Sequence, residues 1–367
     1  MLNVFEVADV LVQHIRQTCA EDIALVAYYG SYAQGTATLR SDLDFFFIPA
    51  TEKGYRQSFQ FVVEDIAFDF WPISWERADK MARFEEGFTT LIADSVVIHV
   101  RSEHDHQRFL KLREQIAERQ QPDSGHPFEA LARQHIKQVF EPLYQLRQQA
   151  EKENLAGCVD AAAQILSVVL QTLALLNRTY FRRGWGKNLD QVRAFVQKPG
   201  DLEVQITRIM EATQPQEVQE HCEGLVQDTL DLLIRAHPAK QKGCPDPSRV
   251  TGWFEEACGV LDKLLTACEM GDHQTLFFYL AHIQQETFQM LGALHLGEWK
   301  ADLGRGLYRE LQFPDLMPHL IQRDFYGLHH GIENLKKQLE QHLVQSGVTV
   351  HRFPGIRALQ EALKLRT

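Results

Sequence analysis

The chain lacks the cysteine patterns and the leader sequence that identify several classes of protein. Its 367 residues include six cysteines, and no two of them have the C-x-x-C spacing of a zinc or redox motif. The N-terminus has no basic segment followed by an apolar core, which argues against a secretory signal peptide. Dispersed thiols without such a leader predict a protein of the reducing cytoplasm.

Clusters of positive charge are missing as well. The chain has 38 Lys and Arg against 49 Asp and Glu, a net charge of −11, and the basic residues form no runs. Binding of nucleic acid depends on neutralising phosphates, so this composition argues against a nucleic-acid partner. An acidic surface is compatible with a cationic small molecule, and it is equally a feature that favours solubility.

Uninterrupted apolar runs long enough for a membrane are also absent. The longest apolar stretch, 161–176, is interrupted by four polar residues. We therefore expect a buried helix there, and no membrane partner. The apolar and charged fractions, 44% and 24%, are those of an ordinary soluble globular protein.

Two kinds of patterning divide the chain. We expect an α+β fold in which residues 1–120 form a small α/β catalytic domain with a mixed sheet. A Pro, Gly, Asp and Ser cluster at 120–127 predicts a linker. A large all-α substrate-binding region over 126–345 and a tail over 346–367 follow, and a loop near 237–250 is an alternative boundary within the helical region.

The expected elements alternate in the first part and are helical in the second. The N-terminal elements are a helix over 4–19, strands over 24–29, 42–48 and 95–100, and a hairpin over 59–74. The helices beyond the linker are expected over 128–151, 155–181, 201–211, 216–236, 253–270, 273–294 and 324–345.

The chemistry is concentrated in residues 28–49, where an Asp-x-Asp pair heads an apolar run. Alternate side chains of a strand share a face, so Asp42 and Asp44 would stand about 6–7 Å apart. Both carboxylates could then reach a pair of Mg²⁺ ions, which lie about 3.5–4 Å apart in two-metal sites. Carboxylates at the mouth of a buried strand are costly without a cation, which favours a metal site.

A Gly-Ser turn precedes this pair and follows the strand over 24–29. Gly30 lets the backbone approach a ligand closely, and Ser31 opens a helical turn whose N–H groups and hydroxyl suit a phosphate. The turn is not a P-loop, because the G-x-x-x-x-G-K-S/T pattern occurs nowhere in the chain. A phosphate-holding turn beside a carboxylate pair predicts Mg²⁺-dependent phosphoryl or nucleotidyl transfer.

Asp69 is the candidate for a third carboxylate. It is the lone charge in the apolar segment 66–72, where a cation would explain it. Glu64 and Asp65, just before this segment, are interpreted as the turn of a hairpin.

A strand, Gly-Ser, ten intervening residues and Asp-x-Asp in an apolar strand resemble the signature of the nucleotidyltransferase superfamily typified by DNA polymerase beta. The layout is similar to the aminoglycoside (kanamycin-type) and minimal nucleotidyltransferases, in detail over residues 24–100. The resemblance implies that Gly30 and Ser31 hold a nucleoside triphosphate and that Asp42 and Asp44 bind Mg²⁺. It also implies that Asp69 completes the metal site or acts as the base.

The resemblance further implies that a basic residue of the helical region reaches the nucleotide phosphates, and Lys187 is the candidate. The alternative is a basic helix C-terminus that complements the helix dipole. Glu85 and Glu86 could supply a base, but a solvated helix face explains them better, and Asp69 already offers a base. The pair His329–His330 lacks a completing cysteine or carboxylate, so we expect no zinc site.

The function that follows is Mg²⁺-dependent transfer of AMP from ATP to a hydroxyl of an aminoglycoside-like small molecule, releasing pyrophosphate. The rivals are a protein adenylyltransferase resembling antitoxins of this superfamily and a non-catalytic nucleotide-binding module. An RNA-modifying enzyme is disfavoured by the acidity of the chain.

Overall fold

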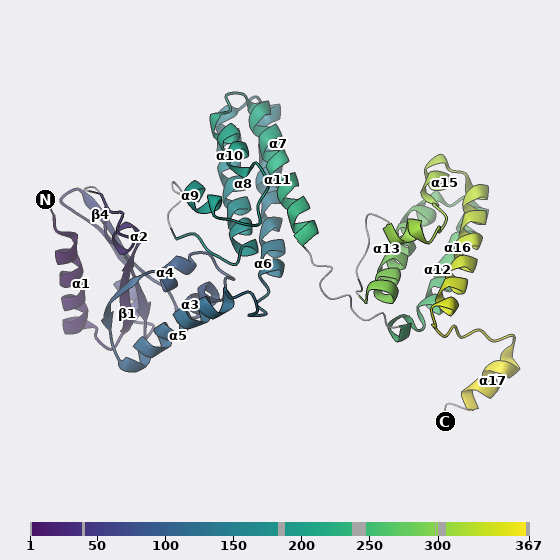
Figure 1. Cartoon of the computed structure of the whole chain (residues 1–367), viewed down its shortest axis with the longest axis horizontal. Coiled ribbons are helices and arrows are strands. Elements are labelled where there is room, and N and C mark those ends of the chain that lie inside the picture. The colour runs from purple at the N-terminus through teal and green to yellow at the C-terminus, as the bar shows by residue number, and fades with distance from the viewer. Residues whose placement is uncertain are drawn as a thin grey trace. The chain divides into compact units, whose positions relative to one another are not determined.

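The protein consists of two compact units, Met1–His237 and Pro238–Thr367 (Figure 1). The computed structural model describes residues 2–38, 41–182, 188–236, 247–297, 299 and 306–364. Each unit is described by itself.

The first unit begins with a five-stranded mixed sheet in the order β3-β4-β2-β1-β5. β2 and β4 are parallel, and the other neighbours are antiparallel. The sheet confirms the predicted α+β class. Its strands are β1 (Ile23–Tyr29), β2 (Asp44–Pro49), β3 (Phe59–Val63), β4 (Ile66–Pro72) and β5 (Val96–Val100).

The predicted hairpin is formed by β3 and β4. Glu64 and Asp65 connect the strands with φ angles of 46° and 65°. Two consecutive positive φ angles are the conformation of a two-residue hairpin turn, because its twist matches that of the strands. The interpretation of these two acids as turn residues is confirmed.

Helices cover both faces of the sheet. α1 (Val4–Thr18) lies on one face, where its apolar side chains pack with Phe45 and Phe47. Phe46 points to the opposite face and packs with Phe109 of α5 (Glu103–Arg119). α3 (Trp75–Ala82) and α4 (Thr89–Ala93) complete this second layer. β2 is therefore buried on both faces, as its run of aromatic residues predicts.

The rest of the first unit is helical. Its elements are α6 (Phe128–His135), the 3₁₀ turn Ile136–Val139, α7 (Phe140–Glu151), α8 (Leu155–Leu176), α9 (Asn188–Arg193), α10 (Leu202–Glu211) and α11 (Pro215–Ala236). The single helix predicted over 128–151 is wrong, because the 3₁₀ turn divides it. Pro142 then falls in the first turn of α7, where its missing N–H is not needed.

α8 also ends earlier than predicted, at Leu176. The side chain of Asn177 accepts hydrogen bonds from the backbone N–H groups of Val196 and Gln197, at 2.9 and 2.8 Å, and donates to Leu173 O. These bonds offer the backbone an alternative to continuing the helix.

α8 has the length and composition of a membrane-spanning helix, but 56% of its most apolar window is buried inside the protein. It packs against α6, α7 and α11, as expected of a core helix in a bundle.

The apolar residues on one face of the sheet and those of α6–α11 form one continuous core, whereas the other face forms a separate cluster with α1. The predicted boundary near residue 120 falls between α5 and α6, and it stays a prediction.

The second unit is helical over its described residues and has a core of its own. Its elements are the 3₁₀ turn Pro247–Val250, α12 (Trp253–Met270), α13 (His273–Leu296), α14 (Gly306–Glu310), α15 (Met317–Gln322), α16 (Phe325–Gln345) and α17 (Ile356–Lys364). α17 lies in the segment that the sequence analysis gives as a tail.

Candidate active site

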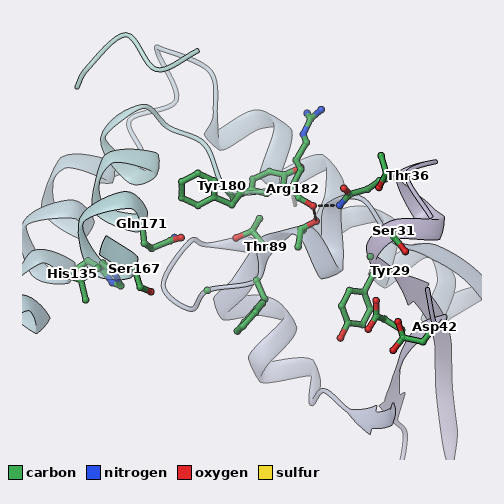
Figure 2. Close-up of a pocket in the computed structure, with 18 of the residues that line it drawn as sticks. Tyr29, Ser31, Thr36, Asp42, Thr89, His135, Ser167, Gln171, Tyr180 and Arg182 are labelled. Atoms are coloured by element: carbon green, nitrogen blue, oxygen red, sulfur yellow. Dashed lines mark hydrogen bonds between the residues drawn. The ribbon is translucent and has the colours of Figure 1, made fainter. Parts of the chain in front are cut away.

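A cavity of about 690 Å³ lies within the first unit, between the sheet layer and the helices that follow it. Its walls are the turn after β1, the loop before β2, residues 87–90, parts of α6 and α8, and residues 180–182. Figure 2 shows Tyr29, Ser31 and Asp42 at one end and His135, Ser167 and Gln171 at the other.

Gly30 and Asp44 approach each other closely in this cavity. A Cβ atom placed on Gly30 would lie 2.1 Å from Oδ2 of Asp44, and Gly30 has a φ of +76°. Contact with the carboxylate and the left-handed backbone each favour glycine. Ser31 follows in the four-residue helix α2 (Gly30–Ala33) and also lines the cavity. The sequence-predicted turn and the second aspartate therefore lie together.

Asp42 and Asp44 both line the cavity, but they do not lie on one strand as predicted. β2 begins at Asp44, which pairs with Tyr29, and Asp42 lies in the preceding loop. The ladder stops there because β1 gives way to α2 at Gly30, which leaves residues 41–43 without a neighbour in β1.

Asp69 lies on β4, next to Asp44. The parallel register pairs Phe45 with Phe70, so Asp44 and Asp69 occupy the adjoining positions on one face. Gln60 of the edge strand donates a hydrogen bond of 2.8 Å to Oδ1 of Asp69. Asp69 is exposed and is not part of the cavity wall, so its charge in an apolar segment does not require a cation.

The surroundings of Asp44 disfavour its ionised form. Burial raises the pKa of Asp44 to about 6, and the charges of Asp42 and Asp69 add to the shift. The phenol of Tyr29 accepts a hydrogen bond of 3.3 Å from the Trp71 indole. Burial, followed by the charge of Asp44, raises the pKa of Tyr29 to about 12, so this phenol stays protonated.

This donor set fits a hard divalent cation. Mg²⁺ takes carboxylate oxygens and usually completes its shell with waters and substrate phosphates. The raised pKa of Asp44 indicates that the ionised cluster is unfavourable without a positive charge. Asp42 and Asp44, which both line the cavity, are the carboxylates that could hold such an ion. Among the described residues, Asp42, Asp44 and Asp69 do not form a group whose ligand atoms all lie within 4.8 Å of one another, so the predicted convergence of all three carboxylates is not seen.

The helical wall of the cavity was not predicted from the sequence. His135, Ser167 and Gln171 come from α6 and α8, far along the chain from the Asp-x-Asp pair. Tyr180 was missed too, and its hydroxyl donates a hydrogen bond of 3.2 Å to Oδ1 of Asp94. No local motif marks these residues, because only the fold brings them to the cavity. The interruptions Ser167 and Gln171 in an apolar run were the one available signal.

The remaining candidate residues are Lys187, Glu85 and Glu86. Lys187 lies outside the described residues. Glu86 accepts a hydrogen bond of 2.7 Å from Nε of Arg77, and Glu85 pairs with Arg83 at 2.9 Å. Among the described residues, neither glutamate belongs to the cavity wall.

A separate polar cluster lies on α16 of the second unit. Glu333 approaches Nδ1 of His330 to 3.3 Å and Nδ1 of His329 to 3.7 Å. The expectation that no carboxylate completes this histidine pair is therefore wrong. A glutamate three and four residues further on shares a helix face with each of them. His330 and Glu333 are exposed, and exposed groups of this kind are common without a metal ion.

The helical half of the first unit carries a recognisable signature. Residues 106–237 match the family model of the KNTase C-terminal domain. This segment is separate from the Gly-Ser turn and the Asp-x-Asp pair, which suggested the same superfamily independently. The resemblance to the nucleotidyltransferase superfamily is thereby confirmed. The match supports nucleotidyl transfer as the general type of reaction.

One similar solved structure is that of a nucleotidyltransferase-like protein from Exiguobacterium sibiricum 255-15. Its TM-score is 0.38 and its sequence identity is 9%, over 61% of this chain and 75% of that chain. Similarity at this level carries no argument of its own. A comparison with curated proteins gives no match.

Proposed function

We propose that the protein is an Mg²⁺-dependent nucleotidyltransferase that moves AMP from ATP to a hydroxyl of a small molecule. The observation that carries the proposal is the contact between the Asp44 carboxylate and Gly30 at the end of a cavity that Asp42 also lines. The KNTase C-terminal match over the helices that supply the opposite wall supports the same reaction.

Each residue has a role in this proposal. Gly30 and Ser31 hold the triphosphate, since the Gly-Ser backbone approaches it closely and the Ser31 hydroxyl can donate to it. Asp42 and Asp44 hold Mg²⁺, which when bound neutralises charge on the phosphate oxygens. Asp69 either joins the metal site or takes the proton of the acceptor hydroxyl.

The bond changes are those of a simple displacement. The acceptor oxygen forms a bond to the α-phosphorus, and the bond from that phosphorus to the bridging α–β oxygen breaks. Pyrophosphate leaves with the electron pair, and the hydroxyl proton passes to the base. The protein mainly positions the reactants, because phosphoryl chemistry needs little covalent help.

The proposal includes the cellular setting. The composition supports a cytoplasmic enzyme whose partners are a nucleotide and a small acceptor, without nucleic acid or membrane. Half-buried α8 in a helix bundle is compatible with this setting.

Asp44→Asn tests the proposal, because it removes one metal-binding charge and keeps the shape of the side chain. We expect calorimetry to detect Mg²⁺–ATP binding to the wild type and a loss of at least about 100-fold in transfer in the variant. Asp65→Asn is the matched control, since Asn suits the positive φ of the hairpin turn. Full transfer activity in Asp44→Asn would show that the metal assignment is wrong.

A further inference from the structure

We propose that the acceptor is an uncharged, hydroxyl-rich molecule and not a polyamine of the aminoglycoside type. The inference rests on the proposed function and names the substrate class of the same cavity. It is carried by the charge of the cavity wall and by the direction of the hydrogen bonds within that wall.

Carboxylates are scarce in the cavity. Among the described residues that line it, Asp42 and Asp44 are the only acids, and both are assigned to the metal. The undescribed stretches of this unit up to residue 236, which are 1, 39–40 and 183–187, contain no Asp or Glu in the sequence. Arg182 also lines the cavity, where its backbone carbonyl accepts hydrogen bonds from Gln34 and Thr90. A buried polyamine needs carboxylate partners for its ammonium groups, and this wall does not offer them.

One additional acid, Asp94, contacts residues of the wall and is already engaged. Asp94 lies behind the wall, where Oδ1 accepts the Tyr180 hydroxyl at 3.2 Å and Oδ2 accepts the Thr90 hydroxyl at 3.0 Å. Its charge is therefore met by the protein's own donors. The acidity of the whole chain, which is compatible with a cationic substrate, is not concentrated in the cavity.

Three hydroxyls of the wall, those of Thr89, Thr90 and Tyr180, donate their protons to the protein and are left as acceptors. Tyr180 and Thr90 donate their protons to Asp94, and Thr89 donates to the carbonyl of Met81 at 2.9 Å. Burial, followed by the charge of Asp94, raises the pKa of Tyr180 to about 12, so the phenol keeps its proton. Each oxygen then offers lone pairs to a ligand that donates, such as an alcohol.

The end of the cavity formed by α6 and α8 provides neutral hydrogen-bond donors and acceptors. Ser167 and Gln171 are one turn apart on α8, line the cavity, and have no side-chain hydrogen bond within the described part of the chain. His135 lies beside them, and burial lowers its pKa, which keeps the imidazole neutral near pH 7. Amides, hydroxyls and a neutral imidazole match a polyol, whose groups both donate and accept.

An aromatic side chain supplies the apolar part of the site. Phe88 lines the cavity, is 60% exposed and has a φ of +67°. A bulky residue in the left-handed region is unfavourable, and such strain is concentrated at ligand sites. The ring offers a flat apolar face to the carbon skeleton of a sugar or cyclitol.

The test uses pairs of acceptors that differ in charge alone. The protein is incubated with labelled ATP, Mg²⁺ and either an aminocyclitol or amino sugar or its fully hydroxylated counterpart, and labelled products are separated. We expect the label on the hydroxylated member of at least one pair, with the amine member at least about tenfold poorer. Labelling of the amine members instead, or of neither class, overturns the inference.

Two variants test whether the acceptor occupies the Gln171 end of the cavity. Gln171→Glu places a carboxylate in the cavity, and we expect it to raise the KM for the neutral acceptor about tenfold while the KM for ATP is unchanged. Gln145→Glu, on the exposed side of α7, is the matched control and should leave both KM values unchanged. A rise in the KM for ATP alone would mean that the nucleoside occupies this end of the cavity, which also overturns the inference.

Failure of the inference is distinguishable from failure of the proposed function. Calorimetry with Mg²⁺–ATP tests nucleotide binding without any acceptor, and absence of binding refutes the proposed function. Binding of ATP together with labelling of the amine acceptors leaves the proposed function intact and refutes the uncharged substrate class alone.

Discussion

Two independent requirements restrict position 30 to glycine. The position needs both a positive φ and empty space where a Cβ atom would meet the carboxylate. Gly35, five residues on, also has a positive φ of +66°, but a Cβ atom there would meet nothing within 4 Å. Comparing substitutions at Gly30 and Gly35 therefore separates the effect of backbone strain from the effect of displacing Asp44.

We expect Gly30→Ala and Gly35→Ala to destabilise the protein similarly through backbone strain, by about 1–2 kcal/mol each. Only Gly30→Ala should also lower the rate of transfer, by about 100-fold. The added methyl group would displace the Asp44 carboxylate, and a small displacement of a catalytic group has an effect of this size. Urea unfolding and transfer assays measure the two effects. Equal activity in both variants would contradict the role given to this contact.

Tyr180 connects the segment after α8 to the end of α4 through Asp94. We expect Tyr180→Phe to cost about 1.5–3 kcal/mol of the free energy of unfolding, because a hydrogen bond to a charged acceptor is lost. Tyr144→Phe, at an exposed position of α7, is the control and should change it by less than about 0.5 kcal/mol. Chemical denaturation of both variants provides the measurement, and equal stabilities would refute the link.

At the scale of residues, the sequence predicts what is local. Gly30, Ser31 and Asp44 are close in the chain, and a strand followed by a turn is sufficient to bring them together. Placing Asp69 required a correct strand register across β2 and β4, and its exposure could not be deduced from the pattern of its own strand. Tyr180 and Gln171 had no local signal, since their position depends on the packing of whole helices.

At the scale of elements, apolar periodicity located the long helices well and their interruptions poorly. The helix predicted over 253–270 coincides with α12. The break between α6 and α7 and the end of α8 were missed. The end of α8 depends on tertiary hydrogen bonds of Asn177, and the 3₁₀ turn between α6 and α7 has only a local capping bond that no sequence pattern marks. Periodicity reports which face is buried, and it contains little information about where a helix stops.

The contact between α13 and α16 provides a prediction about pH. Nε2 of His295 lies 2.8 Å from Nε2 of His342, so one ring donates and the other must be neutral to accept. Burial lowers the pKa of His295, and burial together with the charge of His295 lowers that of His342.

Histidines whose folded pKa is lowered contribute stability above their unfolded pKa, about 6.5, and that stability is lost as the pH falls further. We therefore expect thermal stability to fall between pH 7.5 and 5, and to fall less in His295→Gln. Because buried histidines of the first unit, such as His126, add a similar trend, the difference between wild type and variant is the quantity to compare. His104→Gln is the exposed control, and an unchanged pH profile in His295→Gln would refute the link.

At the scale of the whole molecule, the division into two units with separate cores predicts two unfolding transitions. Leu173 of α8 and Leu261 of α12 are fully buried in different cores. Leu→Ala at either position should cost about 2–5 kcal/mol. In differential scanning calorimetry each substitution should lower one transition and leave the other in place. A single transition that both substitutions lower would show that the units unfold together.

α8 has two tasks, because its apolar side is the core of the bundle and its Ser167–Gln171 side is a wall of the cavity. An inserted or deleted residue near its middle would turn one half of the helix by about 100° relative to the other. Either change would at once bury the amide of Gln171 and expose leucines of the core. Substitution of a single side chain on the cavity side of this helix can therefore change acceptor selectivity without disturbing the core. A change in the length of the helix should instead prevent the bundle from folding.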